Sequence, residues 1–379
     1  MSLALSTLIY EWRRYLAAVI ALAFSGLLVL AQVGMFIGIG KGFTATIDRS
    51  PADIMVLGPK AESLMNGGSG LPRRLIGQVY MNPEVVEVAD LDGSGGRWVN
   101  DPGPGKKRVR EWVNVSAVDT RKGAVTWPND YNEAIRAALQ EPYGVALDRT
   151  ALKRLGVKLG DKASINGKTV HVRYVLDGYP NMMQAVVIMS RDTLRMLGEA
   201  STGDRVGPLM VRLRDPAMAE PIRDQLNAQA KGAYRAWTRE ELSKANDGAM
   251  MKEQFIGIML GFSVFLGLLI GVGITSQTLR GAILANIKEF ASLRALGVSM
   301  GSLRMIVVEL SVWVGVAGMG ATAILVSGVA ALAGSAGVPM SFPIPTVIAS
   351  AVFLLTISVL SGLMALGILK KSQPADLLR

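Results

Sequence analysis

The chain has 379 residues, 50% of them hydrophobic, and a formal net charge of +10. This composition is too apolar for an ordinary soluble protein, and the lack of cysteine excludes disulfides, iron–sulfur clusters and thiolate zinc sites. The positive charges flank apolar stretches or are scattered, apart from the basic run KKRVR at residues 106–110, so they predict loop anchoring and no nucleic-acid partner.

The N-terminal part predicts two helices. Residues 1–15 are amphipathic, with Leu5, Leu8 and Trp12 on one face, which is typical of a helix that lies in the membrane plane at the cytoplasmic surface. Residues 16–40 contain no charged side chain and exceed the roughly 20 apolar residues that cross a bilayer. We therefore expect a retained membrane anchor here rather than a cleaved signal peptide.

Residues 41–253 predict a large α+β domain. Short runs rich in β-branched residues are separated by turns, and the turn INGK at residues 165–168 is a hairpin signal. Helical patterns over residues 148–156 and 190–198 each end on a glycine cap, and residues 216–232 read as a longer helix. The predicted strands cover residues 52–58, 84–93, 111–119, 162–178, 184–190 and 207–215.

Three further spans are predicted in the C-terminal part. A Gly- and Pro-rich turn at residues 334–345 divides the long apolar tract, so the spans fall at residues 254–279, 305–333 and 346–369. Lys and Arg gather before the first span, in the 280–304 loop and in the 370–379 tail. Because positive charges near short loops are retained in the cytoplasm, both termini and this loop are predicted to be cytoplasmic, with the α+β domain on the opposite side.

Glycines in the second span form two pairs with small-residue spacing, Gly257 with Gly261 and Gly267 with Gly271. Such spacing lets two helices approach closely. Glycine is also common in membrane helices generally, but two successive pairs favour a helix-packing face.

The sequence shows no catalytic or nucleotide-binding constellation. Its single histidine, His171, falls in an alternating strand pattern, and it has no metal-site, nucleophile-elbow or phosphate-loop spacing. The spans also lack the intramembrane charges that ion-coupled transporters use. We therefore predict a protein that is not an enzyme and has no metal or cofactor, and any ATP-driven step then needs a partner.

The 280–304 loop contains a second amphipathic pattern. Ile287, Phe290 and Leu293 fall on one helical arc, Lys288 faces the opposite way, and Gly297 ends the helix. On pattern alone, this helix either anchors the loop at the membrane surface or contacts a partner protein.

Several segments together resemble one family. KEFASLRALGVSMGSLRMIVVEL resembles the cytoplasmic loop of FtsX/MacB/LolC-type ABC transporter permeases, in which a Glu precedes an L-R-A-L-G passage. ADIMVLG resembles the D-hydrophobic-V strand that follows their first span, and the stretch YGVALDRTALKRLGVKLGDKASINGKTVHVRYVLDGY resembles their LG-hydrophobic-x-x-GD passage. The N-terminal segment and the ending KKSQPADLLR look most like the DevC branch. MacB has a fused ATPase, whereas these 379 residues contain no nucleotide-binding signature.

The resemblance implies a mechanotransmitting permease of the inner (cytoplasmic) membrane, with four transmembrane α-helices and a large α+β MacB-like periplasmic domain between spans one and two. Two copies would pair with two copies of an ABC ATPase subunit, and a periplasmic adaptor (membrane fusion) protein and an outer-membrane channel would complete the export complex. It also implies that an ATPase-coupling helix contains Ile287, Lys288, Glu289, Phe290, Leu293, Arg294, Leu296 and Gly297.

Two alternatives to export of a lipid-like or periplasmic cargo stay open at this point. One is an FtsX-like signalling subunit that controls a periplasmic cell-wall hydrolase, and the other is a lipoprotein-releasing permease like LolC. The partners separate them: an adaptor favours export, a hydrolase favours signalling, and a lipoprotein carrier favours lipoprotein release.

Overall fold

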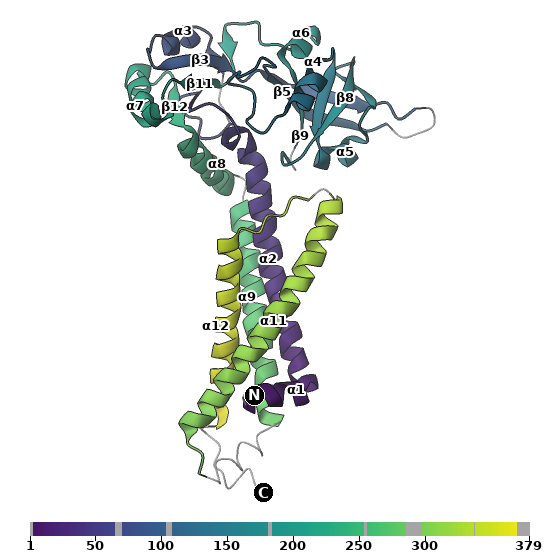
Figure 1. Cartoon of the computed structure of the whole chain (residues 1–379), viewed down its shortest axis with the longest axis vertical. Coiled ribbons are helices and arrows are strands. Elements are labelled where there is room, and N and C mark those ends of the chain that lie inside the picture. The colour runs from purple at the N-terminus through teal and green to yellow at the C-terminus, as the bar shows by residue number, and fades with distance from the viewer. Residues whose placement is uncertain are drawn as a thin grey trace. The chain divides into compact units, whose positions relative to one another are not determined.

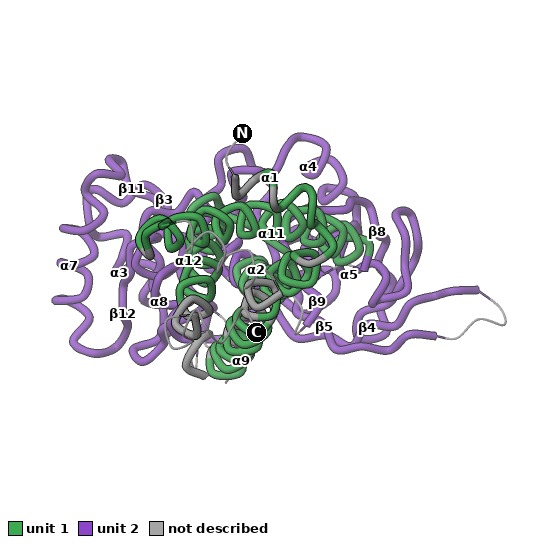
Figure 2. Tube along the Cα trace, turned by 90° about the horizontal axis from the view of Figure 1, so that it is seen from below, with its two compact units in different colours: residues 1–38, 258–335, 340–379 green, residues 39–257, 336–339 purple. Residues whose placement is uncertain are grey.

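The computed structural model describes residues 3–64, 70–103, 108–180, 184–253, 256–285, 297–336 and 338–369. The chain divides into two compact units, which Figure 2 shows in different colours, and Figure 1 labels the helices and strands. Unit 1 holds residues 1–38, 258–335 and 340–379, and unit 2 holds residues 39–257 and 336–339. Unit 1 is helical and unit 2 mixes helices and strands, in agreement with the predicted α+β domain.

The helices of the first unit are α1 (Leu3–Tyr10), α2 (Trp12–Asp48), α9 (Ile256–Ala285), α11 (Met300–Ala336) and α12 (Ile344–Leu369), and the last turns of α2 belong to unit 2. Three stretches are long and apolar enough to cross a membrane: Tyr15–Gly42, Gly301–Ala336 and Ile344–Leu363. Helix α9 contains a shorter apolar stretch, Gly261–Ile274. The described residues therefore offer three candidate spans by this measure, and the count of four stays a prediction.

Helices α2, α11 and α12 share one apolar core that includes Tyr15, Leu22, Val314 and Leu354. Their close approach depends on small residues, because a Cβ on Gly318 of α11 would lie 2.8 Å from the Cβ of Leu22. Buried hydroxyls in these helices donate to backbone carbonyls. The Oγ of Ser358, for example, lies 2.6 Å from the carbonyl oxygen of Ser311, which satisfies both polar groups where no water is present.

One half of unit 2 is a four-stranded antiparallel sheet in the order β12-β1-β11-β3. The strands are β12 (Arg235–Thr238), β1 (Ile54–Leu57), β11 (Leu209–Leu213) and β3 (Val85–Asp90). Alternate residues of β1 enter two different cores, because successive strand side chains point to opposite faces. Ile54 and Val56 pack with helices α3 (Leu75–Tyr80) and α7 (Ala219–Ala230), whereas Met55 and Leu57 pack with the end of α2 and with α8 (Arg239–Glu253). We call this half the sheet lobe; the short pair β2 (Leu71–Pro72) and β10 (Arg205–Val206) adjoins it.

The other half, the barrel lobe, is a closed barrel in the order β4-β5-β9-β6-β8-β7. Its strands are β4 (Gly93–Asn100), β5 (Arg110–Val118), β6 (Gly144–Asp148), β7 (Lys162–Ile165), β8 (Lys168–Leu176) and β9 (Ala185–Ser190). Closure removes free strand edges, and the interior is filled by side chains such as Trp98, Val113 and Leu147. Helices α4 (Glu133–Gln140), α5 (Arg149–Leu155) and α6 (Arg191–Met196) belong to the same lobe (Figure 1).

Local turn and cap signals are confirmed. Ile165 pairs with Lys168 across a two-residue hairpin in which Asn166 (φ 49°) and Gly167 (φ 86°) take the left-handed conformation that such a turn requires. Helix α5 begins after Asp148, whose side chain accepts from the backbone N–H of Thr150, and it ends at the left-handed Gly156.

Other elements differ from the prediction. The pattern misses β4, since its glycine-rich sequence GSGGRWVN has low strand propensity, and it also misses the short strands β6 and β12. The helix predicted over residues 216–232 starts with the 3₁₀ turn η1 (Pro216–Met218), so α7 itself begins at Ala219. His171 lies half-buried on β8, at the strand position that its pattern predicts.

Candidate functional site

Most of the predicted ATPase-coupling helix lies outside the described residues. This holds for Ile287, Lys288, Glu289, Phe290, Leu293, Arg294 and Leu296. Gly297 is described: it is exposed, has a φ of 92° and precedes α11, while α9 ends at Ala285. The start of α11 is capped by Ser299, whose Oγ accepts from the backbone N–H of Ser302 at 3.2 Å.

The four glycines predicted to pack helices all lie in α9. A Cβ on Gly267 would lie 3.5 Å from the Cβ of Leu28 in α2, and Gly261 has no neighbouring atom within 4 Å of that position. A tighter glycine contact is made by α2 itself, where a Cβ on Gly26 would lie 2.8 Å from a methyl carbon of Leu354. Close packing among the described helices therefore also depends on glycines outside α9.

The sheet lobe is connected to the end of α2 directly by the polypeptide backbone. The strand β1 follows α2 after a short turn, and the turn is fixed because the Oδ2 of Asp53 accepts from the backbone N–H of Leu213 at 2.8 Å. Helix α8 lies alongside, with the Oγ of Ser243 donating to the Oδ1 of Asp48 at 2.7 Å. The last turn of α2 is thus joined to the sheet lobe directly through the backbone.

The hydrogen bonds of the barrel lobe to the same helix end centre on Arg49. Arg49, the residue after α2, donates from Nη1 to Asp130 Oδ2 at 2.7 Å, and its guanidinium carbon lies 4.3 Å from the ring centre of Tyr179. The hydroxyl of Tyr179 donates to the other oxygen of Asp130 at 2.6 Å, and the backbone N–H of Asn129 donates to the carbonyl of Arg49 at 2.8 Å. We call Arg49, Asp130 and Tyr179 the α2 joint.

The surroundings of the α2 joint keep the Tyr179 hydroxyl protonated and allow its loop to approach α2 closely. Burial raises the pKa of Tyr179, and the hydrogen bond to Asp130 raises it further, so the hydroxyl stays a donor at neutral pH. Gly178 has a φ of 85°, and a Cβ there would lie 2.6 Å from an Nη atom of Arg49. A Cβ on Gly42 of α2 would collide with the carbonyl oxygen of Pro180. The loop that carries Tyr179 therefore sits against α2 where only glycine fits.

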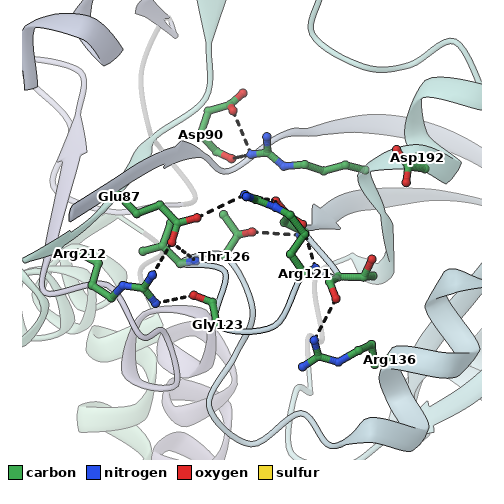
Figure 3. A network of polar contacts seen from close by, with 12 residues as sticks. Glu87, Asp90, Arg121, Gly123, Thr126, Arg136, Asp192 and Arg212 are labelled. Carbon is green, nitrogen blue, oxygen red and sulfur yellow. Dashed lines mark hydrogen bonds and ion pairs between the residues drawn. The ribbon is translucent and has the colours of Figure 1, made fainter. Parts of the chain in front are cut away.

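A second polar network joins the two lobes across a groove of about 550 Å³ (Figure 3). Its centre is Glu87 of β3, which accepts from Arg212 of β11 at 2.7 Å. From the segment between β5 and α4, the backbone N–H of Val125 donates to Glu87 at 3.1 Å and Arg121 donates to it at 3.4 Å. A further bridge runs from Arg191 of α6 to Asp90 of β3, with 2.9 Å between Nη2 and Oδ1.

We call this second set of contacts the interlobe network; it consists of Glu87, Asp90, Asp119, Arg121, Arg191 and Arg212. Its carboxyl groups are paired with arginines, which is typical of a structural contact between two parts of a fold. Burial of Asp119 opposes its ionisation, but hydrogen bonds from the side chain and backbone of Arg121 outweigh it and lower the pKa of the carboxyl. Glu87, Asp90 and Asp119 each form an ion pair with an arginine. Among the described residues, no group of three His, Cys, Asp or Glu could hold a metal ion.

Sequence patterns could not single out these residues, because each contact joins distant segments. Arg49 and Asp130 are 81 residues apart, and Glu87 and Arg212 are 125 residues apart. The one local signal is the stretch DGYP at residues 177–180, whose composition is typical of a turn.

Two families match this chain. The MacB-like periplasmic core domain matches residues 15–229, and the FtsX-like permease C-terminal domain matches residues 261–374. The chain belongs to the MacB/FtsX family of ABC transporter permeases. It is thus a membrane protein, and permeases of this family work with ABC ATPase partners.

Solved structures of external domains are also similar to parts of this permease. The periplasmic region of MacB from Actinobacillus actinomycetemcomitans is 15% identical, covers 52% of this chain and 94% of its own, and has a TM-score of 0.35. The extracellular domain of the noncanonic ABC-type transporter YknZ from Gram-positive bacteria is 14% identical, covers 49% and 99%, and has a TM-score of 0.30. A domain of a proposed permease from Porphyromonas gingivalis is 10% identical, covers 49% and 89%, and has a TM-score of 0.30.

No curated protein is significantly similar to the chain. The family assignment rests on the two matched sequence domains.

Proposed function

We propose that this permease is the transmembrane subunit of an export complex, which relays ATP hydrolysis by a separate ATPase to its periplasmic domain. The observation that carries this proposal is α2. It is one helix from Trp12 to Asp48 that contains a candidate span and ends between the attachments of the sheet lobe and the barrel lobe. A helix held at its end in this way passes a displacement to both lobes without any passage of cargo through the spans.

The proposal includes a DevC-type assembly. Two copies of the permease pair with two ATPase subunits, and a periplasmic adaptor and an outer-membrane channel complete the path of a lipid-like or periplasmic cargo. The uncharged tracts 16–40, 254–279 and 310–369 support this, because a permease that moves cargo outside its spans needs no charged path within them.

In the proposed topology, the protein has four spans in the inner membrane and both termini are cytoplasmic. The chain has no cysteine, so single cysteine variants report topology without background. Lys158→Cys in the barrel lobe should react with an impermeant maleimide from the periplasm, and Ser6→Cys should react only after the inner membrane is permeabilised. The reverse labelling pattern would contradict the topology.

The relay itself is tested at the predicted coupling helix. Phe290→Asp places a charge where an apolar side chain is predicted to enter a groove on the ATPase, so the permease should stop stimulating ATP hydrolysis by the copurified ATPase. Ser292→Asp, predicted to face away from the ATPase, is the matched control and should keep stimulation within about twofold. Equal rates of ATP hydrolysis with wild type and Phe290→Asp, with both complexes intact, would contradict the proposal that this helix couples the permease to the ATPase.

The partners that copurify with the full chain in mild detergent decide between export and the alternatives. An ATPase together with an adaptor protein supports the exporter. An ATPase with a cell-wall hydrolase and no adaptor would replace export by FtsX-like signalling, and a lipoprotein carrier would replace it by lipoprotein release.

A further inference from the structure

The outward face of strands β4 and β5 presents one large aromatic side chain to solvent. Trp112 of β5 is 55% exposed, although tryptophan is usually well buried. Its indole lies on Gly95 of β4: a Cβ at Gly95 would be 2.8 Å from the Cζ2 of Trp112. The glycine thus supports one side of the ring and leaves the other side open.

Two arginines flank this indole on the same face. Arg97 pairs directly opposite Trp112 in the ladder, and Arg110 lies two residues before it on β5, so all three side chains point outward. Both arginines are exposed, and neither guanidinium forms an ion pair with any carboxylate of the described residues. Asn114, also exposed and on the same face, adds a neutral polar group.

Three other arginines of the barrel lobe form ion pairs. Arg149 is paired with Asp177, Arg154 with Glu111 and Arg173 with Glu141, at distances between 2.5 and 2.7 Å. Of the arginines on the described barrel strands, Arg97 and Arg110 alone have no ion pair, and both flank Trp112. The strands also carry Lys162 on β7 and Lys168 on β8.

Other tryptophans of unit 2 are also covered. Arg136 stacks 4.7 Å from the ring centre of Trp127, Arg235 stacks 3.8 Å from that of Trp237, and Trp98 is fully buried with its Nε1 donating to a carbonyl. Trp112 has no such cover and no hydrogen-bond partner for its indole N–H among the described residues.

We propose that Arg97, Arg110, Trp112 and Asn114, the Trp112 face, form a docking site for an acidic segment of a partner protein. Charge complementarity selects the acidic partner, since two free guanidinium groups can each bind a carboxylate in two-point geometry. The choice of a protein follows from the residue types, because tryptophan and arginine are the usual anchors of protein interfaces. An anionic bilayer surface instead attracts lysine-rich clusters with several apolar side chains, and the Trp112 face has one aromatic ring and no lysine.

The test uses the full chain in nanodiscs of zwitterionic lipid and a fluorescein-labelled 12-residue peptide of alternating Glu and Tyr. Fluorescence anisotropy should show binding that weakens with salt, because exposed charges are screened. Trp112→Ala and the double variant R97A/R110A should each weaken binding about tenfold or more, as expected when interface anchors are lost. Gly95→Ala, which keeps Trp112 but lifts its indole off β4, should weaken binding in the same direction.

Two controls make the result specific. Arg173→Ala removes an arginine that is ion-paired on another part of the barrel and should leave binding unchanged. A Gln-Tyr peptide of the same length should not bind.

Equal binding by wild type and Trp112→Ala, or no binding of the acidic peptide at all, would overturn the proposal. Binding of dihexanoyl phosphatidylglycerol that depends on Trp112, without peptide binding, would assign the face to lipid instead and equally overturn it. Neither measurement involves an ATPase, so failure here leaves the proposed ATP relay standing.

Discussion

The sheet lobe and the barrel lobe meet the end of α2 in different ways. The sheet lobe is tied by the chain, through the turn from Asp48 to β1, and by the apolar core that Ile47 shares with β1 and α8. The barrel lobe contacts this helix end through the α2 joint and a backbone hydrogen bond from Asn129. Val125, in the segment between β5 and α4, is also buried in the same core as Ile47.

This difference separates a fixed coupling from an adjustable one. A backbone connection between a helix and a strand cannot open without unfolding, whereas an ion pair and a ring contact each contribute about 1 kcal/mol at a partly exposed site. The proposed relay therefore predicts that the sheet lobe follows α2, and that the α2 joint is the weaker of the two attachments.

Removal of the arginine in the α2 joint is expected to have the largest effect. Arg49→Ala deletes the ion pair with Asp130 and the contact with Tyr179, so unfolding free energy should fall by about 2 kcal/mol, after allowance for the partial exposure of both partners. The barrel lobe should also move more freely against the sheet lobe. Spin labels on Gln140→Cys of α4 and Glu220→Cys of α7 should then show a broader distance distribution than in the parent protein.

Arg149→Ala is the matched control for this variant. Its ion pair with Asp177 is as short, at 2.6 Å, but both side chains are more than 60% exposed, at 69% and 67%. No measurable change in Tm or in the label distances is expected. If Arg49→Ala behaves like Arg149→Ala, the α2 joint does not hold the barrel lobe.

The interlobe network should give the next largest effect. Glu87→Gln removes the charge that Arg212 and Arg121 share, in a side chain that is only 15% exposed, and should lower the unfolding free energy by about 1 to 2 kcal/mol. Thermal unfolding in detergent measures the change.

For comparison, Glu133→Gln alters a carboxylate that is 71% exposed and bridges only within α4. It should leave the Tm unchanged. An equal loss in both variants would show that Glu87 does not link the lobes.

The sequence predicted turns and helix caps, which depend on neighbouring residues, and it missed the strand pairing that closes the barrel. The hairpin at Asn166 and Gly167 and the cap at Gly156 follow from conformations that few residues tolerate, so a local pattern reveals them. The barrel requires β5 to pair in parallel with β9, whose residues lie some seventy positions later, and no local pattern encodes that pairing. The same limit applies to the site residues. Trp112 could not be predicted as part of a binding face, because only the strand register places it opposite Arg97 and against Gly95.

The close fit of the loop against α2 is tested by comparing two glycines with positive φ. Gly178→Ala and Gly160→Ala both force alanine into a left-handed conformation, which costs about 1 kcal/mol. At Gly178 the new Cβ also meets the guanidinium of Arg49 at 2.6 Å, whereas nothing lies within 4 Å at Gly160. Gly178→Ala should therefore be the less stable variant, by up to about 1 kcal/mol, in chemical denaturation. Equal losses would show that Arg49 yields to the added methyl group at no cost.

The smallest expected effect is a pH dependence that distinguishes the interlobe network from the α2 joint. The pKa of Asp119 is lowered from its ordinary 3.8, because hydrogen bonds from Arg121 overcome the opposing effect of burial. Because the folded pKa lies below the unfolded one, this carboxylate stabilises the fold above about pH 4, and the contribution is lost as pH falls through the folded pKa. The contribution of Asp119 to the unfolding free energy should thus be constant from pH 7 to 5 and should decline below pH 4. Asp119→Asn should make the acid decline shallower.

The α2 joint should respond differently at high pH. Burial and the bond to Asp130 raise the pKa of Tyr179, so the phenol stays protonated through pH 10, where an ordinary tyrosine ionises, and Tyr179→Phe should not change the alkaline profile up to that pH. A change in the alkaline profile below pH 10 on Tyr179→Phe would show that the ring is solvated and that the barrel lobe is not held there.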